Sequence, residues 1–366
     1  MKFDCPRKEF SDAVSAAANG AAVRSSQVIL QSLKVEATDS GIRILGCDGE
    51  MWVERTVACL VTEPGAVCVQ AKTLNELASS LTTGDVHFQT LDGSGALLSQ
   101  GASEYRLQTL DADDFPEPPS FGGDGQLSLK AGVFRRAVDS VGYAVSSDEH
   151  RQVLRGILMQ YNGSTLTLVA TDTHRLAVRR MPLEGAGEAT SVVIPDKALK
   201  AIKSLPIDDD KDLTLVLGNQ RVGVEAAGAK VVSQLLVGAY PNWERVVPSE
   251  TTRTWSMAAD QLKEKVKRTL IIARDNAGRV KFSAKGDEVE LSAHSDEKGD
   301  ARERVDIISN NGEVEIAFNG KYVLDTVEAI EGEGVRVEMT ESSRPAIFRP
   351  TETDEYFCVI MPMHLA

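Results

Sequence analysis

An internal repeat is the feature of this sequence that most constrains its fold. Three segments share one order of residue types, in which an apolar run is followed by a lysine and then by an amphipathic stretch: VCVQAKTLNELASSL, SVVIPDKALKAIKSL and VEIAFNGKYVLDTVEAI. Their lysines, Lys72, Lys197 and Lys321, are 125 and 124 residues apart. The near-equal spacing predicts three similar units along the 366 residues.

A second triplet of segments keeps the same rhythm. It consists of KEFSDAVSAAANGA from Lys8, AGVFRRAVDSVGYAV from Ala131 and ADQLKEKVKRTLIIA from Ala259. Each places apolar residues at positions i, i+3, i+4 and i+7, which is typical of a helix with one buried face. In the second segment we expect that face to carry Phe134, Val138, Val141 and Val145.

The stretches between these helices alternate apolar and polar residues. LTLVATDTHRLAV and EVELSAH are two examples, and both patterns favour strands. Two stretches rich in Pro, Gly and polar residues, from Asp111 to Gly125 and from Ala239 to Thr252, mark the boundaries. The sequence therefore predicts three α+β domains, each with two helices and antiparallel strands, at residues 1–122, 123–250 and 251–366.

The net charge of the chain is −14. Phosphate binders usually carry a basic excess, so charge alone argues against nucleic acid unless the basic residues are unevenly distributed. The predicted helices do concentrate them, since they contain Lys8, Lys72, Arg135, Arg136, Lys197, Lys200, Lys203, Lys263, Lys265, Lys267, Arg268 and Lys321. Any single lysine among them is explained by an ordinary exposed helix face. The concentration of basic residues in the helices as a group favours a basic surface built from the helices.

Several classes of protein are disfavoured by what the sequence lacks. No apolar run approaches the roughly 18 residues that a membrane span needs, and the opening MKFDCPRKEF does not resemble a signal peptide. The five cysteines form no C-x-x-C pair, which fits reduced thiols in the cytoplasm. The histidines are scattered and there is no P-loop, so we expect no metal, no other cofactor and no ATP site.

Five short motifs carry a resemblance to a known family. They are MKF at the start, ADDFP at 112–116, VATDTHRLAV at 169–178, YPNWERVVP at 240–248 and VIMPMHL at 359–365. In order and spacing they resemble the bacterial sliding clamps, the β subunits of DNA polymerase III, over essentially the whole chain. The resemblance implies three DNA-clamp domains per chain. It also implies that two chains form a closed ring of six domains, with helices inside and sheets outside.

The function implied by the resemblance is binding rather than catalysis. A clamp of this kind is a processivity factor that encircles double-stranded DNA without reading its sequence and tethers the replicative polymerase. The implied partners are the DNA polymerase III α subunit, the clamp loader complex, other replication and repair proteins with clamp-binding peptides, and a second copy of the chain. The implied location is the cytoplasm, with no membrane partner.

The resemblance also implies a surface pocket that accepts a short peptide from partner proteins. Carried over residue by residue, its members are Leu154, Thr171, His174, Arg175, Leu176, Pro241, Arg245, Val246, Val359, Ile360, Met361, Pro362 and Met363. Apolar walls with a few polar groups suit a peptide that inserts hydrophobic side chains, and methionine adapts to different ligands. His364 departs from the arginine that is usual in the family and is expected at the rim. VIMPM could instead be a buried last strand, and both interpretations can hold together.

The residues expected to contact DNA are Arg24, Arg136, Arg151, Lys197, Lys263 and Lys267. The loop containing Arg151 departs from the family, which often presents tyrosines there, whereas this chain has Gln152 and Val153. The residues expected at the dimer interface are Glu104, Tyr105, Leu107, Ile271, Ile272, Arg302 and Arg304. The charges at this interface look partly exchanged relative to the family, because an acid stands on the first-domain edge and two arginines stand on the third-domain edge.

Two other functions compete with the clamp. Asp172 and His174 could be members of a catalytic pair, but no nucleophile elbow, matched cysteine or carboxylate cluster completes it. The alternative for Asp172 is a β-turn in which the carboxylate satisfies backbone groups. The repeat could also build a scaffold that holds no DNA, which retention on circular but not on linear DNA would distinguish from a clamp.

Overall fold

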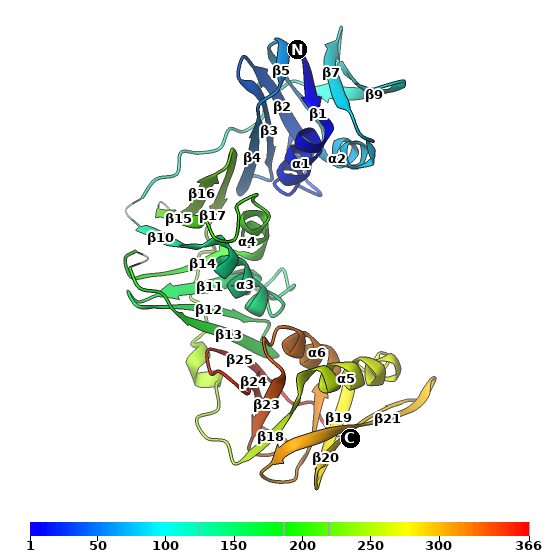
Figure 1. Cartoon of the computed structure of the whole chain (residues 1–366), viewed down its shortest axis with the longest axis vertical. Coiled ribbons are helices and arrows are strands. Elements are labelled where there is room, and N and C mark those ends of the chain that lie inside the picture. The colour runs from blue at the N-terminus through cyan, green and yellow to red at the C-terminus, as the bar shows by residue number, and fades with distance from the viewer. Residues whose placement is uncertain (124, 186, 219, 366) are drawn as a thin grey trace. The chain divides into compact units, whose positions relative to one another are not determined.

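The protein was analysed as a computed structural model, which describes residues 1–123, 125–185, 187–218 and 220–365. These residues form two compact units. Unit 1 contains Met1–Phe134 and Lys197–Leu235, and unit 2 contains Arg135–Gly185, Ala189–Asp196 and the chain from Leu236 onward. Each unit therefore takes part of the middle third of the sequence, and each is described by itself below (Figure 1).

Unit 1 is built around one antiparallel sheet with the strand order β10-β15-β16-β17-β4-β3-β2-β6-β9-β8-β7-β1-β5. Its elements are β1 (Lys2–Pro6), α1 (Arg7–Ala18), η1 (Val28–Gln31), β2 (Ser32–Thr38), β3 (Gly41–Cys47), β4 (Met51–Val57), β5 (Leu60–Glu63), β6 (Gly65–Gln70), α2 (Ala71–Ser80), β7 (Asp85–Leu91), β8 (Gly95–Gln100), β9 (Ser103–Leu110), β10 (Gly125–Lys130), β15 (Asp212–Gly218), β16 (Arg221–Ala226) and β17 (Ala229–Gln234).

Unit 2 is built around a second antiparallel sheet with the order β14-β11-β12-β13-β25-β24-β23-β18-β21-β20-β19-β22. Its elements are η2 (Gln152–Arg155), β11 (Gly156–Tyr161), β12 (Thr165–Thr171), β13 (Arg175–Pro182), β14 (Thr190–Pro195), η3 (Trp243–Val246), β18 (Arg253–Ala258), α5 (Ala259–Ala273), β19 (Arg279–Lys285), β20 (Glu288–Ser295), β21 (Gly299–Asn310), β22 (Glu315–Asn319), α6 (Gly320–Glu328), β23 (Gly334–Met339), β24 (Ala346–Pro350) and β25 (Tyr356–Ile360). Along the chain, α3 (Ala131–Gly142) and α4 (Asp196–Lys203) each cross from one unit to the other.

Two strand pairings explain why three predicted domains appear as two units. In unit 1, β17 pairs with β4, so that Val231 lies opposite Val53. In unit 2, β13 pairs with β25, so that Leu176 lies opposite Val359. Backbone hydrogen bonds therefore run across both predicted domain boundaries, and each sheet continues through a boundary without an edge.

The helices form where the sequence pattern predicts them. In α1, Phe10, Ala13, Val14 and Ala17 follow the i, i+3, i+4, i+7 spacing, and all four are buried in the core of unit 1. The end of α1 lies very close to β3, because a Cβ on Gly46 would stand only 2.0 Å from the Ala17 carbonyl oxygen. Glycine is therefore required at position 46 for this packing.

One detail of the helix prediction is wrong. α3 ends at Gly142, so Val145 lies beyond the helix, and its side chain is only half-buried. The chain turns there, with Ala144 N–H donating to the Val141 carbonyl at 3.0 Å. Tyr143 lies in this turn, and its ring and carbonyl contact the side chain of Arg175 in unit 2.

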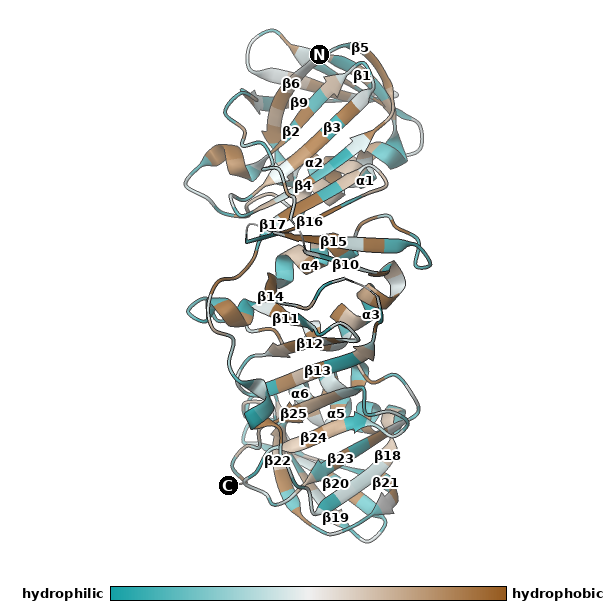
Figure 2. Cartoon of the chain, turned by 90° about the vertical axis from the view of Figure 1, so that its left-hand side faces the viewer, coloured by the Kyte–Doolittle hydropathy of each residue, from teal (hydrophilic) through white to brown (hydrophobic). Residues whose placement is uncertain are grey.

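The strands confirm the alternation seen in the sequence. The burial of β15 alternates along its length, as expected for a strand with one face on a core, and Figure 2 shows hydrophobic residues along this strand. The stretch LTLVATDTHRLAV forms two strands, β12 and β13, joined by a tight turn. That turn carries several of the predicted pocket residues.

Candidate functional site

The turn between β12 and β13 is organised by Asp172. Its Oδ1 accepts hydrogen bonds from the backbone N–H groups of His174 (2.9 Å) and Arg175 (3.0 Å). Thr171 Oγ1 donates to the Arg175 carbonyl at 2.7 Å, which closes the turn from the other side. Asp172 therefore satisfies backbone groups, as the turn interpretation predicted.

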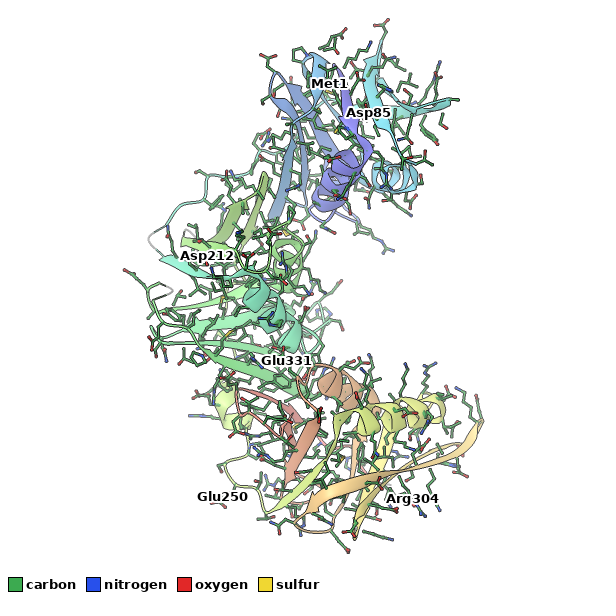
Figure 3. The ribbon with its side chains drawn as sticks, viewed as in Figure 1. Met1, Asp85, Asp212, Glu250, Arg304 and Glu331 are labelled. Atoms are coloured by element: carbon green, nitrogen blue, oxygen red, sulfur yellow. The ribbon has the colours of Figure 1, made fainter. Side chains whose placement is uncertain are left out.

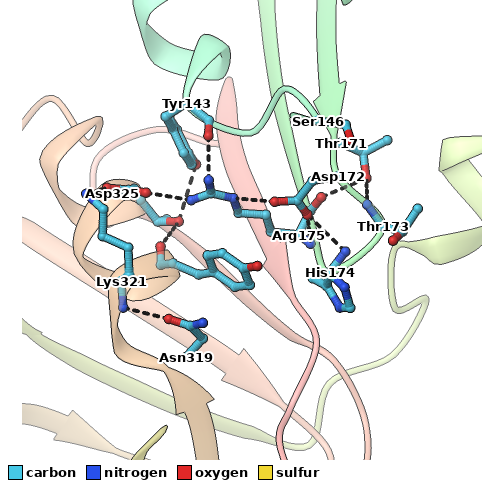
Figure 4. A network of polar contacts seen from close by, with 12 residues as sticks. Tyr143, Ser146, Thr171, Asp172, Thr173, His174, Arg175, Asn319, Lys321 and Asp325 are labelled. Atoms are coloured by element: carbon cyan, nitrogen blue, oxygen red, sulfur yellow. Dashed lines mark hydrogen bonds and ion pairs between the residues drawn. The ribbon is translucent and has the colours of Figure 1, made fainter. Parts of the chain in front are cut away.

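Arg175 leaves this turn and points into unit 2, where three different groups bind its guanidinium (Figure 4). Nε lies 3.0 Å from Asp172 Oδ2, Nη1 lies 2.7 Å from Asp325 Oδ2, and Nη2 donates to the Tyr143 carbonyl at 2.5 Å. The side chain is only 9% exposed. Burial alone would lower the pKa of Arg175, but the carboxylates of Asp325 and Asp172 raise it above its ordinary value.

Aromatic rings stack around the same guanidinium. Its central carbon lies 4.4 Å from the ring centre of Tyr322 and 5.1 Å from that of Tyr143. The Tyr322 ring also stacks with the His174 ring, at a centroid distance of 6.4 Å. The turn and helix α6 are thus joined by stacked side chains as well as by charge.

Sequence reasoning did not identify Tyr143, Tyr322 or Asp325 as members of this site. Tyr322 and Asp325 follow Lys321 in the third lysine-containing segment, and neither belongs to one of the five motifs. Arg175 and Asp325 are 150 residues apart in the chain. A single sequence gives no local signal for such a contact.

An apolar cluster lies beside the turn. It includes Leu176 on β13, Val359 on β25 and Trp243 in η3, all of which are buried. Val153 of η2 and Tyr240 pack against it as partly buried neighbours. The three motif segments that carry predicted pocket residues and the segment around Leu154 therefore meet around one hydrophobic cluster, although they are far apart in the sequence.

The predicted pocket residues differ in how much of each is available to a ligand. Leu154, Thr171, Leu176, Val359 and Ile360 are buried. Ile360 also lies on the opposite side of β25 from Val359, because neighbouring side chains of a strand alternate between its faces.

The remaining pocket residues form an exposed rim. Met361 is 40% exposed and Val246 is 45% exposed. His174, Pro241 and Arg245 are exposed, while Pro362 and Met363 are half-buried. The C-terminal segment is held in place by its backbone, since Met361 N–H donates to the His174 carbonyl (2.9 Å) and Met363 N–H donates to the Ala317 carbonyl (2.7 Å).

A polar hollow of about 200 Å³ adjoins the turn. It is lined by Ser146, Ser147, Asp148, Arg151, Asp172, His174 and Tyr322. Arg151 was predicted to contact DNA, but here it pairs with Asp148 (3.2 Å) and donates to Thr173 Oγ1 (2.6 Å). It therefore supports the same turn that presents His174.

The other predicted DNA contacts vary in their surroundings. Arg24, in the loop after α1, Arg136 on α3 and Lys267 on α5 are exposed. Lys263 lies 3.8 Å from Glu328. Lys197 is held more tightly, with Nζ 2.5 Å from Asp48 and 3.4 Å from the Ala21 carbonyl, so part of its charge is already compensated within unit 1.

The predicted dimer residues lie on or beside two strand edges. β9 pairs with β8 along its length but with β6 only at its last two residues, and no other strand of the described residues covers the rest of that edge. On this strand Leu107 is buried, Tyr105 is half-buried and Glu104 is exposed.

In unit 2, β21 pairs with β20 over Gly299–Asp306 and with β18 only at its last residues, from Ile307 to Asn310, so among the described residues its other side has no partner strand over Gly299–Asp306. Arg302 and Arg304 are exposed there, each near an acid of β20: Glu290 at 3.4 Å and Glu288 at 3.7 Å, respectively. Figure 3 marks Arg304 on this long arm of the sheet. On α5, Ile271 is 54% exposed, which is unusual for so large an apolar side chain.

Two features are absent from the described ranges. None of the helices there has the length and apolar character of a membrane span. Nor do the His, Cys, Asp and Glu side chains in those ranges gather in groups of three or more that could hold a metal ion.

Comparison with known families matches the chain almost from end to end. Residues 1–119 match the N-terminal domain of the DNA polymerase III beta subunit, residues 128–242 match its central domain and residues 244–364 match its C-terminal domain.

Individual relatives give the same result. The beta sliding clamp of Staphylococcus aureus is 29% identical over 373 residues, which cover 99% of each chain. The beta subunit structure from Thermotoga maritima superposes with a TM-score of 0.91 at 25% identity, covering 100% of both chains. A sliding clamp from Pseudomonas aeruginosa, solved bound to griselimycin, gives 0.88 at 27% identity with the same full coverage. The chain belongs to the DNA polymerase III beta subunit family, the bacterial sliding clamps.

Proposed function

We propose that two copies of this chain close into a ring of six clamp domains around double-stranded DNA and tether the replicative polymerase there. The ring is a non-catalytic processivity factor and needs no cofactor. Its partners are the polymerase α subunit, the clamp loader and other replication and repair proteins, and it works in the cytoplasm. The observation that carries the proposal is the apolar cluster around which the separated motif segments meet.

The partner peptide binds over that cluster. Leu176 and Val359 form the floor, and Met361 and Val246 stand at the sides with enough exposed surface to receive hydrophobic side chains. The thioether of Met361 adapts to different ligands, which suits a pocket shared by several partners. His174 supplies a polar group at the rim.

Arg175 has a positioning role in this proposal. Its guanidinium already binds Asp172, Asp325 and the Tyr143 carbonyl, so few of its N–H groups are available to a ligand. Arg175 holds the turn in which His174 is exposed and in which the His174 carbonyl accepts a hydrogen bond from Met361 N–H. Leu154 and Ile360 support the pocket from beneath in the same way.

Retention on DNA is topological, with weak and salt-sensitive contacts from side chains on the helices and loops. The contributors are Arg24, Arg136, Arg151, Lys197, Lys263 and Lys267. Their contributions are unequal, because Lys197 and Arg151 already have intrachain partners. Contacts to phosphates carry no sequence information, which fits a ring that must move along any DNA.

The ring closes where β9 of one copy meets β21 of the next. Two uncovered strand edges can continue one sheet by backbone hydrogen bonds. Tyr105 and Leu107 pack against Ile271 and Ile272, which gives an apolar centre of the kind found in obligate dimers. We also propose domain boundaries at residues 1–122, 123–250 and 251–366.

The peptide pocket is tested by two matched truncations. Removing Met361–Ala366 takes away the exposed wall and both backbone bonds of the tail, whereas removing only 364–366 leaves Met361, Pro362 and Met363 in place. Titration calorimetry with a clamp-binding peptide should show at least about a tenfold loss of affinity, roughly 1.4 kcal/mol, for the longer truncation only. Equal affinities in two dimeric, folded variants would contradict the pocket assignment.

The clamp function is tested with DNA of two topologies. Protein loaded by the clamp loader and ATP should stay on closed circular DNA and leave the same DNA once it is linearised. Reversing three charges together should reduce loading or retention while leaving the dimer intact: Arg136→Glu, Lys263→Glu and Lys267→Glu. Equal retention on both topologies, or a strong preference for one DNA sequence, would refute a sliding ring.

A further inference from the structure

The N-terminal strand places two cysteines side by side. β1 pairs antiparallel with β5, and the register sets Phe3 opposite Val61 and Asp4 opposite Leu60. Continued by one residue, the same register sets Cys5 opposite Cys59. Cα atoms of directly opposed residues in an antiparallel pair lie about 4.5 or 5.5 Å apart, depending on the pair type. Both separations fall in the range that a disulfide bridges, about 4.4–6.8 Å.

The side chains of the pair face the same way. Cys5 is fully buried in the hydrophobic core of unit 1, and Cys59 packs against that core as a partly buried neighbour. The S–H group of Cys5 lies 3.6 Å from the Pro6 carbonyl oxygen. After burial, the neighbouring Cys59 is the strongest influence that raises the pKa of Cys5. The register and the shared core therefore place the two thiols near each other on one side of the β1–β5 pair in the reduced protein.

The two thiols are not equivalent. Burial raises the pKa of Cys5 to about 12. Burial also raises the pKa of Cys59, but hydrogen bonds from the Cys5 thiol and the Ile42 backbone N–H oppose that rise by stabilising an anion on Cys59. Cys59 is also the more exposed of the two, next to the short edge strand β5. Cys59 is therefore the sulfur that an oxidant reaches first, while Cys5 lies behind it as a buried thiol.

We propose that Cys5 and Cys59 form a reversible oxidative modification site, in which a peroxide converts the thiol pair into a disulfide that joins β1 to the start of β5. In the first step the Cys59 sulfur attacks one peroxide oxygen, the O–O bond breaks, and Cys59 becomes a sulfenic acid as one water leaves. In the second step the Cys5 sulfur attacks the Cys59 sulfur. The S–O bond then breaks, and the hydroxide leaves as water with the Cys5 proton.

The bridge has a structural consequence in the first clamp domain. β5 is a four-residue strand at the end of its sheet, which makes it an easy place for the sheet to open. The disulfide would close a loop that contains α1 and β2–β4, so it restrains the unfolded chain as well as the edge. Because thiols in a cytoplasm are kept reduced, the bond forms only when peroxide is present and is reversed by thiol reductants.

The test uses the full-length clamp treated with hydrogen peroxide, at a dose that fully oxidises a free cysteine peptide. Remaining thiols are then alkylated, and the protein is digested with trypsin without reduction. We expect the peptide Phe3–Arg7 linked to Thr56–Lys72, with a combined mass lower by two hydrogen atoms. We also expect a rise in melting temperature that a thiol reductant reverses.

Two variants identify the sulfurs, because Thr56–Lys72 also contains Cys68. Cys68→Ala should retain the linked peptide and the shift in melting temperature, whereas Cys59→Ala should lose both. Each variant is first checked for native circular dichroism and dimer formation. The proposal is overturned if Cys59 is oxidised or alkylated while Cys5 stays unbridged, if both thiols survive the peroxide dose, or if Cys59→Ala shows the same reversible shift as the unaltered protein.

Discussion

Replacing Arg175 with methionine should loosen the peptide pocket from within. Methionine preserves the length of the side chain but removes the charge that joins Asp172 to Asp325. The two carboxylates are 15% and 12% exposed, so neither can recover its lost partner fully from water. Breaking a buried ion pair by removing one partner costs about 3–5 kcal/mol.

The structure places the expected cost at the lower end of that range. Asp172 keeps its two backbone donors, and Asp325 keeps Lys321, whose Nζ lies 2.5 Å away. We therefore expect a loss of about 3 kcal/mol in the local free energy of opening, which corresponds to roughly 100-fold faster amide exchange in β13 and α6. Adding Asp325→Leu should recover about half of the loss, since it removes one orphaned carboxylate.

Hydrogen exchange followed by mass spectrometry is the suitable assay, because a chain with several domains does not unfold in a single two-state step. Arg180→Met is the matched control, since Arg180 lies on the same strand and contacts the Trp243 ring at 5.4 Å, an exposed interaction that contributes about 0.5–1 kcal/mol. All variants are compared at one protein concentration, because dimer formation stabilises the fold. Equal exchange in Arg175→Met and Arg180→Met would refute the reasoning.

Two further predictions concern other parts of the chain. Glu104→Lys should weaken the dimer modestly, by about 0–1 kcal/mol per rim pair, and adding Arg302→Glu and Arg304→Glu should restore it; additive effects without rescue in sedimentation would contradict paired charges at the interface. Hydrogen bonds that the His294 ring N–H groups donate to the carboxylates of Asp300 and Asp296 raise the pKa of His294, so the protonated imidazole is favoured in the folded protein. Its stabilising contribution is then complete below the unfolded pKa of about 6.5 and is lost as pH rises through the folded value. Asp300→Asn should lower the His294 pKa in an NMR titration, and an unchanged midpoint would contradict this pairing.

Much of the fold could be predicted because helices and strands leave short-range patterns of apolar and polar residues in the sequence. Apolar spacing located all six helix segments, and alternation located the strands around the Thr171–Arg175 turn. The end of α3 was missed because Val145 continues the apolar spacing, whereas the chain turns at Gly142. Periodicity reports which face a residue would occupy in a helix, and it does not report where tertiary contacts end that helix.

The sequence predicted which segments form the candidate site, but it did not predict the contacts between their side chains. The motifs located Leu176 and Val359, which lie in one apolar cluster, and Met361, which follows β25 and is exposed. The role of Arg175 could not be foreseen, because its partners Tyr143 and Asp325 lie on elements distant in sequence and become visible only after folding. Lys197 is similar, since only the structure shows that Asp48 compensates its charge.

The strand pairings that cross the domain boundaries have a consequence for how this fold is inherited. Where β17 meets β4 and β13 meets β25, the joint is made by main-chain amides, which are the same for almost every residue. Substitutions can therefore accumulate along these strands while the joint persists, which fits a TM-score of 0.91 at only 25% identity. Insertions are another matter, because a slip of one residue would turn every side chain of the strand to the wrong face. Across this lineage we expect these four strands to vary in residue type and to keep their lengths.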